Sequence, residues 1–277
     1  KTEIAFSLWF FNLFANALRT SFGVLGITSS EMLGGGHAIV NPILVHQSMG
    51  GMLVLFLFGL FAARKHLADV FRKAFLGDAT VDDSDEILSY RTAVFLLLGS
   101  GLVMVLWLAL AGLPVWVGLA FLFTAAALFV GFTRLIAEGG LSDGSVPVGP
   151  AAIVISAVGS SAIGAHGLVV LATTYFWTGV RSFAMTSAAN SLKLGEGFGG
   201  CKRPLFWTML LAMAIGLVSS MWVVMELSYA YGALNLKIPG GQHGFYHYAA
   251  ALIRSPSEPH IAGWINTGIG GAIMLLL

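Results

Sequence analysis

Charge is scarce in this sequence: Asp, Glu, Lys and Arg together make up 10% of its 277 residues. Soluble domains carry about 25% charged residues, so a water-soluble globular fold is excluded. The formal net charge is only +1, and we expect no nucleic-acid partner. The single Cys201 excludes an internal disulfide. Hydrophobic residues fill 57% of the chain instead, which predicts an integral membrane protein.

Enzyme signatures are also missing. The sequence contains no Gly-x-Ser-x-Gly motif, no phosphate loop, no dinucleotide fingerprint and no His-Glu-x-x-His motif. The sequence shows no cluster of residues that could act together as a nucleophile, a general base and metal ligands. We therefore predict that the protein is not an enzyme and has no cofactor.

Long uncharged runs define the predicted fold. Residues 92–133 contain no Asp, Glu, Lys or Arg, which at 1.5 Å per residue is enough for two crossings of a roughly 30 Å hydrocarbon core. The same reasoning predicts six spans, at Ile4–Phe22, Val45–Ala63, Tyr90–Ala111, Val115–Ala137, Leu205–Tyr231 and His260–Leu277. We predict one all-α domain over residues 1–277, a polytopic transmembrane helix bundle of about six full spans plus a re-entrant or broken segment.

Basic residues in the short connections set the predicted orientation. Two groups should be cytoplasmic: Arg64, Lys65, Arg72 and Lys73 after the second span, and Arg181, Lys193, Lys202 and Arg203 before the fifth. Arg134 and Glu138 then lie on the cytoplasmic side as well. For both basic groups to be inside, residues 151–180 must enter and leave on the same membrane face.

The segment 139–180 is the candidate re-entrant region. It is rich in Gly, Ala and Ser, including Ser160 and Ser161, and such small residues allow close backbone approach. A pair of half-helices broken at the Gly-rich centre fits the predicted orientation. One long span packed tightly through its small residues is the alternative, and composition does not decide between them.

Residues 63–89 form the most polar stretch. The pattern over 63–75 predicts an amphipathic helix at the membrane interface. Five acidic residues follow it, Asp78, Asp82, Asp83, Asp85 and Glu86. They lack the glycine and the terminal glutamate of a calcium loop, which favours a solvated cytoplasmic connector.

Arg134 and Glu138 are the first candidate site residues. They are four positions apart, share one helix face and could pair at the membrane edge. With Gly139 and Gly140 beside them, they could form a substrate or ion gate. The alternative is an ordinary helix end with a snorkelling arginine and a C-cap glycine.

Glu226 is the second candidate, because it follows the uncharged run 204–225. A carboxylate there could bind a proton or a cation. It could also lie at the outer membrane interface, among the aromatic belt, where the free-energy cost of a glutamate is low.

Histidines are the third group. His243 and His247 are four apart and are weak metal candidates, but their loop-like surroundings favour a capping or interfacial role. His46 and His166 lie in or near apolar segments. Each could ligate a cofactor, although a single membrane histidine more often hydrogen-bonds a neighbouring helix. We predict no bound metal.

Three stretches carry a resemblance to a known family: TRLIAEGG at 133–140, the opening KTEIAFSLWFF at 1–11, and ELSYAYGALNL at 226–236. Together they resemble poorly characterised bacterial membrane proteins similar to the oligopeptide transporter (OPT) superfamily. The resemblance implies a carrier of roughly twice this length, with this chain as its C-terminal part. It also implies proton-driven movement of small peptides or metal chelates, with Arg134, Glu138 and Gly139–Gly140 as gating residues and Glu226 as a coupling site.

The leading hypothesis is a secondary transporter in the bacterial cytoplasmic membrane. Its substrate or ion pathway would include Arg134, Glu138, Gly139, Gly140, Glu226, Ser160, Ser161 and His166. The alternative is a non-catalytic structural or accessory subunit of a larger, energy-transducing membrane complex. The expected partners are the lipid bilayer, a small peptide or chelate, and a second copy or other chains of a membrane complex.

Overall fold

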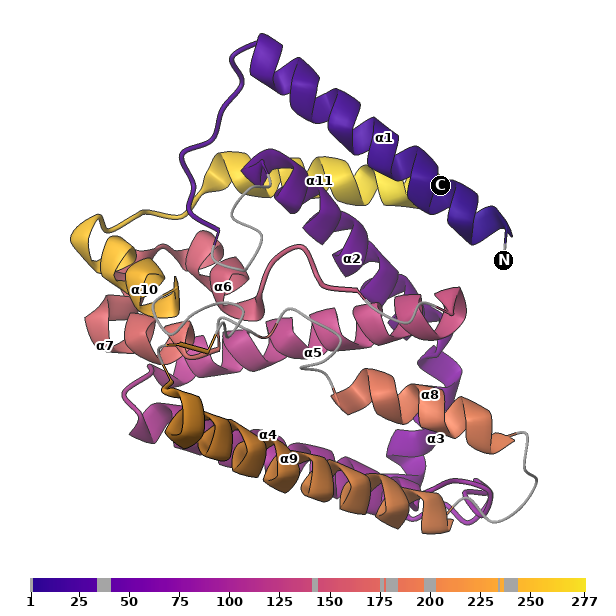
Figure 1. The fold of residues 1–277 in the computed structure, drawn as a ribbon. Coiled ribbons are helices and arrows are strands. Elements are labelled where there is room, and N and C mark those ends of the chain that lie inside the picture. The colour runs from indigo at the N-terminus through magenta and orange to yellow at the C-terminus, as the bar shows by residue number, and fades with distance from the viewer. Residues whose placement is uncertain are drawn as a thin grey trace.

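The computed structural model describes residues 2–33, 41–140, 144–174, 177, 184–196, 203–233, 235–236 and 244–277. In these residues the fold is all-helical, with no β-strand (Figure 1). The elements are α1 (Thr2–Val24), α2 (Pro42–Ala62), α3 (Arg64–Phe71), the π-helical turn η1 (Arg72–Leu76), α4 (Tyr90–Leu110), α5 (Val115–Gly139), α6 (Pro150–Val158), α7 (Ser160–Ala172), α8 (Ala184–Glu196), α9 (Arg203–Tyr231), α10 (Gly244–Arg254) and α11 (Ile261–Leu276). The predicted all-α class is confirmed.

Four helices are long and apolar enough to cross a membrane, namely α2, α4, α5 and α9. The other two predicted spans are helical but differ from these four. Helix α11 is a shorter apolar helix of 16 residues. Helix α1 has 23 residues, but its middle carries Asn12 and Asn16, hydrogen-bonded to each other. The prediction of a membrane protein is thus supported, while only four of the six predicted spans have the length and composition of a full crossing.

Helix α5 is the centre of the packing. It contacts α2, α4, α6 and α8, and apolar clusters line it from Val117 near its start to Ile136 near its end. Lipid tails are as apolar as these side chains, so tight van der Waals packing must hold the helices together rather than water exclusion. Phe121 and Val117 are fully buried, as such packing requires.

Helices α2 and α11 cross with their backbones in contact (Figure 1). Glycines make the crossing possible, because a Cβ atom on Gly50 would collide with the backbone of Thr267 and one on Gly270 with the backbone of Gln47. Small residues at a helix interface favour association within membranes. This crossing brings the start of α2 beside the start of α11.

The segment predicted to be re-entrant is a broken helix rather than one long span. Helix α6 ends at Gly159, whose φ of 82° belongs to the left-handed region. A Cβ atom there would also lie 2.6 Å from the carbonyl oxygen of Ser257. Helix α7 contains a second break at Gly164, with φ 78° and ψ 163°. Glycine is thus required at the first break by both conformation and space.

This segment runs along α5 from the end of that helix toward its start and then back. Val146 packs with Phe132 near the end of α5, whereas α6 and α7 pack around Val117 near its start. The chain then returns, because Thr186 of α8 lies 3.5 Å from Thr133, between their hydroxyl oxygens. Val146 and Thr186 therefore both lie beside the second half of α5. Re-entry from one membrane face stays a prediction, and this path is the one that it requires.

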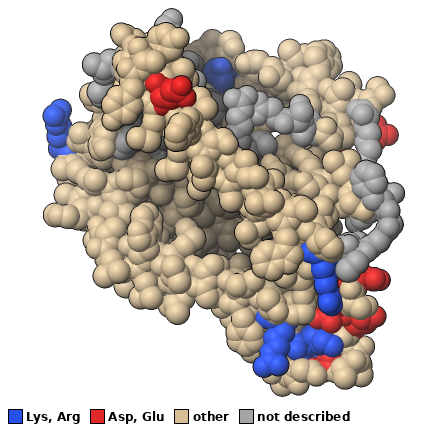
Figure 2. All heavy atoms as spheres, turned by 60° about the horizontal axis from the view of Figure 1, so that its bottom comes forward, with Lys and Arg blue, Asp and Glu red and all other residues tan. Residues whose placement is uncertain are grey.

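The predicted amphipathic helix 63–75 is formed by α3 and η1. The acidic connector after it is held by local pairs: Arg72 bonds Asp78 at 2.8 Å and Lys73 lies 4.0 Å from Asp83. Figure 2 shows a mostly uncharged face whose densest group of charges lies at one lower corner, where Figure 1 has α3 and the connector. A solvated connector agrees with this arrangement.

Candidate functional site

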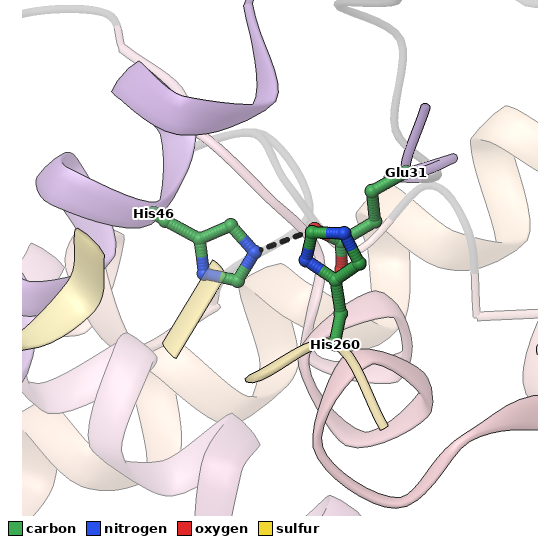
Figure 3. A group of neighbouring side chains, drawn as sticks. All are labelled: Glu31, His46 and His260. Carbon is green, nitrogen blue, oxygen red and sulfur yellow. Dashed lines mark hydrogen bonds and ion pairs between the residues drawn. The ribbon is translucent and has the colours of Figure 1, made fainter. Parts of the chain in front are cut away.

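A buried carboxylate and two histidines meet where three parts of the chain converge (Figure 3). Glu31 comes from the segment between α1 and α2, His46 from the second turn of α2, and His260 from the N-cap of α11. The glycine-mediated crossing of α2 and α11 brings the two histidines together. Gly263 leaves room for them, because a Cβ atom there would collide with the His46 ring.

One carboxylate oxygen faces both rings. Oε2 of Glu31 lies 2.8 Å from Nε2 of His46 and 2.9 Å from Nδ1 of His260. These three atoms all lie within 4.8 Å of one another. This is the only such group of three His, Cys, Asp or Glu side chains in the part of the chain that the structure describes.

The remaining hydrogen bonds allow two tautomers of His46. With its proton on Nε2, His46 donates to Glu31. With its proton on Nδ1, it donates to the Thr267 hydroxyl, 2.9 Å away, which itself donates to the Gly263 carbonyl at 3.3 Å. The backbone N–H of Gly263 donates to Nδ1 of His260 at 3.1 Å, capping α11. In the second tautomer Nε2 of His46 presents its lone pair to the carboxylate, and Nδ1 of His260 presents no proton because its lone pair accepts the Gly263 N–H. Lone pairs facing an anion repel it unless a cation lies between them.

The site is shielded from solvent and leaves polar atoms unpaired. The side chains of His46 and Glu31 are 2% and 8% exposed. Among the described residues, Oε1 of Glu31 and the hydroxyl of Ser156 have no hydrogen-bond partner. Buried polar atoms without partners cost about 1–3 kcal/mol each, so their presence points to a ligand.

Two pockets flank the cluster. One, of about 320 Å³, is lined by His46, His260 and the polar side chains of Thr28, Ser29 and Asn266. The other, of about 210 Å³, is lined by Glu31 and Ser156 together with residues of the 255–260 loop. The cluster is therefore reachable from both sides, although the side chains of Glu31 and His46 are buried and only His260, 32% exposed, is partly open.

The Glu31 carboxyl is ionised at neutral pH. Burial raises its pKa, but the hydrogen bond with His46 and the charges of the two histidines lower it by more, so the pKa lies below its ordinary value. His46 lies in the second turn of α2 and His260 is the N-cap of α11, so two helix N-termini, which favour a nearby negative charge, lie close to Glu31.

The predicted gate residues lie elsewhere, at the far end of α2. Nε of Arg134 bonds Oε1 of Glu138 at 2.8 Å, and the Glu138 side chain is 65% exposed. The Arg134 guanidinium lies over the Phe58 ring. Gly140 caps α5 in the left-handed conformation, with φ 64°. The predicted pairing is present, in the geometry of an ordinary helix end.

The predicted pathway serines hold the broken helix in place. The Ser160 hydroxyl accepts the backbone N–H of Ser257 at 2.8 Å, and the Ser161 hydroxyl donates to the Ser257 carbonyl at 3.3 Å. They join the α6–α7 break to the loop that leads to His260. His166 is exposed on α7, beside the α4–α5 turn at Gly112.

The other predicted residues lie apart from the cluster. Glu226 is exposed on α9 and accepts a hydrogen bond from the Trp222 indole at 3.2 Å. His247 is exposed on α10. His243 lies outside the described residues, as do Arg181 and Lys202 of the orientation argument.

Few features of the sequence indicate this cluster. Glu31 is 15 residues before His46, and Thr267 is 221 residues after it. Only His46 was singled out, and its hydrogen bond to α11 is the alternative expected of a membrane histidine. The one usable signal was Glu31 itself, an isolated acid next to the apolar Met32 and Leu33.

One protein-family model matches residues 1–277, the whole chain, and its description is "Family of unknown function (DUF6785)". No curated protein and no solved structure matches the chain.

Proposed function

We propose that this chain, which belongs to the DUF6785 family of unknown function, is a secondary transporter. It would bind its substrate or coupling ion at the Glu31 cluster. The observation that carries this proposal is a buried carboxylate beside a broken apolar helix. Irregular backbone at membrane depth is tolerated where it lines a cavity, and transporters place their binding sites at such breaks.

The link between the break and the cluster is direct. The backbone N–H of His260 donates to the carbonyl of Ser156 in the last turns of α6, at 3.0 Å. Glu31 and Ser156 line the same 210 Å³ pocket, next to the loop that Ser160 anchors. A movement of α6 against α7 about Gly159 would therefore open or close the pocket beside Glu31.

The substrate class comes from the resemblance to the OPT superfamily, which implies small peptides or metal chelates moved with protons in a bacterial cytoplasmic membrane. The flanking pockets, of about 320 and 210 Å³, suit a compact polar solute of that kind. Under this proposal Arg134 and Glu138 lie at the cytoplasmic end of the pathway, and the length of helix α2 separates them from the binding site.

Uptake into proteoliposomes tests the proposal. The full-length protein is reconstituted, an inward proton gradient is applied, and labelled di- and tripeptides and iron and zinc chelates are offered in turn. We expect gradient-dependent uptake of one class, lost in Glu31→Gln and kept in Asp85→Asn, an exposed acid in the connector. Absence of uptake for every solute, or equal uptake by Glu31→Gln and the wild type, contradicts the proposal.

A second candidate, an accessory subunit of a larger membrane complex, is favoured by one observation. Helices α1 and α9 contain no buried residue, although α9 is 29 residues long. Aromatic side chains such as Trp9 and Trp222 lie on these helices, 59% and 72% exposed. Gentle solubilisation followed by native mass spectrometry separates the two roles: stoichiometric partner chains favour the subunit, and a chain alone or paired with a copy of itself favours the carrier.

A further inference from the structure

We propose that Glu31, His46 and His260 form a binding site for a divalent transition-metal ion such as Zn²⁺. The site would hold the ion through Oε2 of Glu31, Nε2 of His46 and Nδ1 of His260. This inference goes beyond transport, because the ion can be resident in the protein whether or not a solute moves.

The ligand set suits such an ion. Zn²⁺ binds imidazole nitrogen at about 2.0–2.1 Å and carboxylate oxygen at about 2.0–2.2 Å, and two histidines with one glutamate make a known three-ligand set. Ligand atoms around a tetrahedral ion at those distances lie roughly 3.3 Å apart. The observed separations of 2.8 and 2.9 Å from Glu31 need only a small opening to reach this spacing.

The proton positions argue for a cation. Thr267 can hold the proton of His46 on Nδ1, and Gly263 donates to Nδ1 of His260. With its proton on Nδ1, His46 presents the lone pair of Nε2 to Glu31. An ion between them would bind Nε2 of His46, Oε2 of Glu31 and Nδ1 of His260, whose lone pair would turn from the Gly263 N–H to the ion. The His46–Thr267 contact is also the outer hydrogen bond that orients most metal-binding histidines.

Hard cations fit less well. Mg²⁺ and Ca²⁺ prefer six or more oxygen ligands, whereas two of the three ligands here are imidazole nitrogens, which suit Zn²⁺, Cu²⁺, Ni²⁺ and Fe²⁺. The unpaired Oε1 of Glu31 and the Ser156 hydroxyl supply further oxygen atoms nearby. A position toward the 320 Å³ pocket remains for water or a bound solute, which is the arrangement of an open metal site.

Metal binding is measured on the purified full-length protein after any polyhistidine tag has been removed. The protein is first treated with EDTA, and the EDTA is then removed by buffer exchange. Titration with Co²⁺ should give one ion per chain with visible d–d absorption bands, and Zn²⁺ should displace it. X-ray absorption of the Zn²⁺ form should report two imidazole ligands. Zn²⁺ should also raise the Tm of the wild type, because it binds the folded state.

Five variants locate the ion. Glu31→Gln and His46→Asn should weaken Co²⁺ binding at least tenfold, and His66→Asn, at an exposed histidine of α3, should leave it unchanged. Thr267→Val removes only the positioning hydrogen bond and should weaken binding about 10- to 100-fold, whereas Thr267→Ser should retain it.

Two results would overturn the proposal. The first is a wild type that binds neither Co²⁺ nor Zn²⁺ up to about 100 μM, with no change in Tm. The second is unchanged affinity in folded Glu31→Gln and His46→Asn. If those variants do not fold, the wild-type stoichiometry, ligand count and Tm decide alone. No gradient or solute is present, so a failure here is distinct from a failure to transport.

Discussion

Glu31 and Glu138 lie near opposite ends of α2, and their surroundings are opposite too. Glu138 pairs with Arg134 one turn away on the same helix, and its side chain is 65% exposed. Glu31 is 8% exposed and faces histidines from two other elements. His46 and Gly59, which Arg134 approaches, are 13 residues apart on α2, or about 20 Å along its axis.

The comparison shows that a pair that is easy to recognise in the sequence can contribute little to the free energy of unfolding. A pair four residues apart is found by counting, but its exposed charges are worth about 0–0.5 kcal/mol. A cluster assembled from distant segments cannot be found by counting. Yet its members lose water on burial, and removing one partner leaves a costly unpaired group.

The largest effect should come from separating α2 and α11, which removes the cluster and leaves the Arg134 end intact. Gly270→Val would drive a side chain into the backbone of Gln47 and should destabilise the protein by about 3 kcal/mol or more. Gly268→Val on the same helix meets nothing within 4 Å and is the matched control. Thermal unfolding followed by circular dichroism measures both, and equal losses would contradict the close crossing.

The next effect is the coupling within the cluster. A double-mutant cycle of Glu31→Ala and His46→Ala should give a coupling energy of about 2 kcal/mol, because the two groups touch at 2.8 Å and are buried. Unfolding in mixed detergent and SDS micelles, on metal-free protein, supplies the free energies. A coupling below about 0.5 kcal/mol would place the cluster in the same class as a surface pair.

The same cycle at the other end of α2 should give far less. Arg134→Ala and Glu138→Ala should couple by less than about 0.5 kcal/mol, since Glu138 is mostly in solvent or at the interface. Raising the salt concentration should reduce this coupling further. A value comparable with the Glu31–His46 coupling would show that Arg134 and Glu138 are held more tightly than their exposure indicates.

The smallest effect concerns a third carboxylate, Asp78 of the connector. Hydrogen bonds from Thr80, and then the charge of Arg72, lower the pKa of Asp78 below its ordinary value. Its contribution is therefore present above the ordinary carboxyl pKa and is lost as the pH falls through the lowered value. The protection of the Thr80 amide, whose N–H bonds Asp78 at 2.9 Å, should fall in acid when its hydrogen-exchange rate is divided by the intrinsic rate at each pH. Asp78→Asn should remove this pH dependence.

Much of the fold followed from periodicity and glycine. Every predicted span lies in a helix, since an apolar run in a membrane must satisfy its own backbone hydrogen bonds. The small residues at 151–167 left a broken helix and one long span both open, and the structure has the break, at Gly159. The count of six spans stays a prediction, because Asn12 and Asn16 make α1 more polar than the four long apolar helices and α11 is shorter than they are.

The site could not be predicted in the same way. Predictions for Arg134 and Glu138 used spacing along one helix, which fixes which side chains meet. Glu31, His46 and His260 meet because Gly50 and Gly270 let two helices touch, and no local pattern states which helices will cross. Ser160 and Ser161 were noticed for their size, whereas their hydroxyls serve as anchors for the 255–259 loop.

The backbone contact between α2 and α11 also decides which parts of the molecule can move. Sliding either helix by one turn would bring a side chain against the partner's main chain where Gly50 and Gly270 now fit, so we expect the two helices to move as one rigid body. The spacing of His46 and His260 is built into that body. Any change at the cluster must therefore come from the segment that carries Glu31, or from α6 and α7 turning about Gly159.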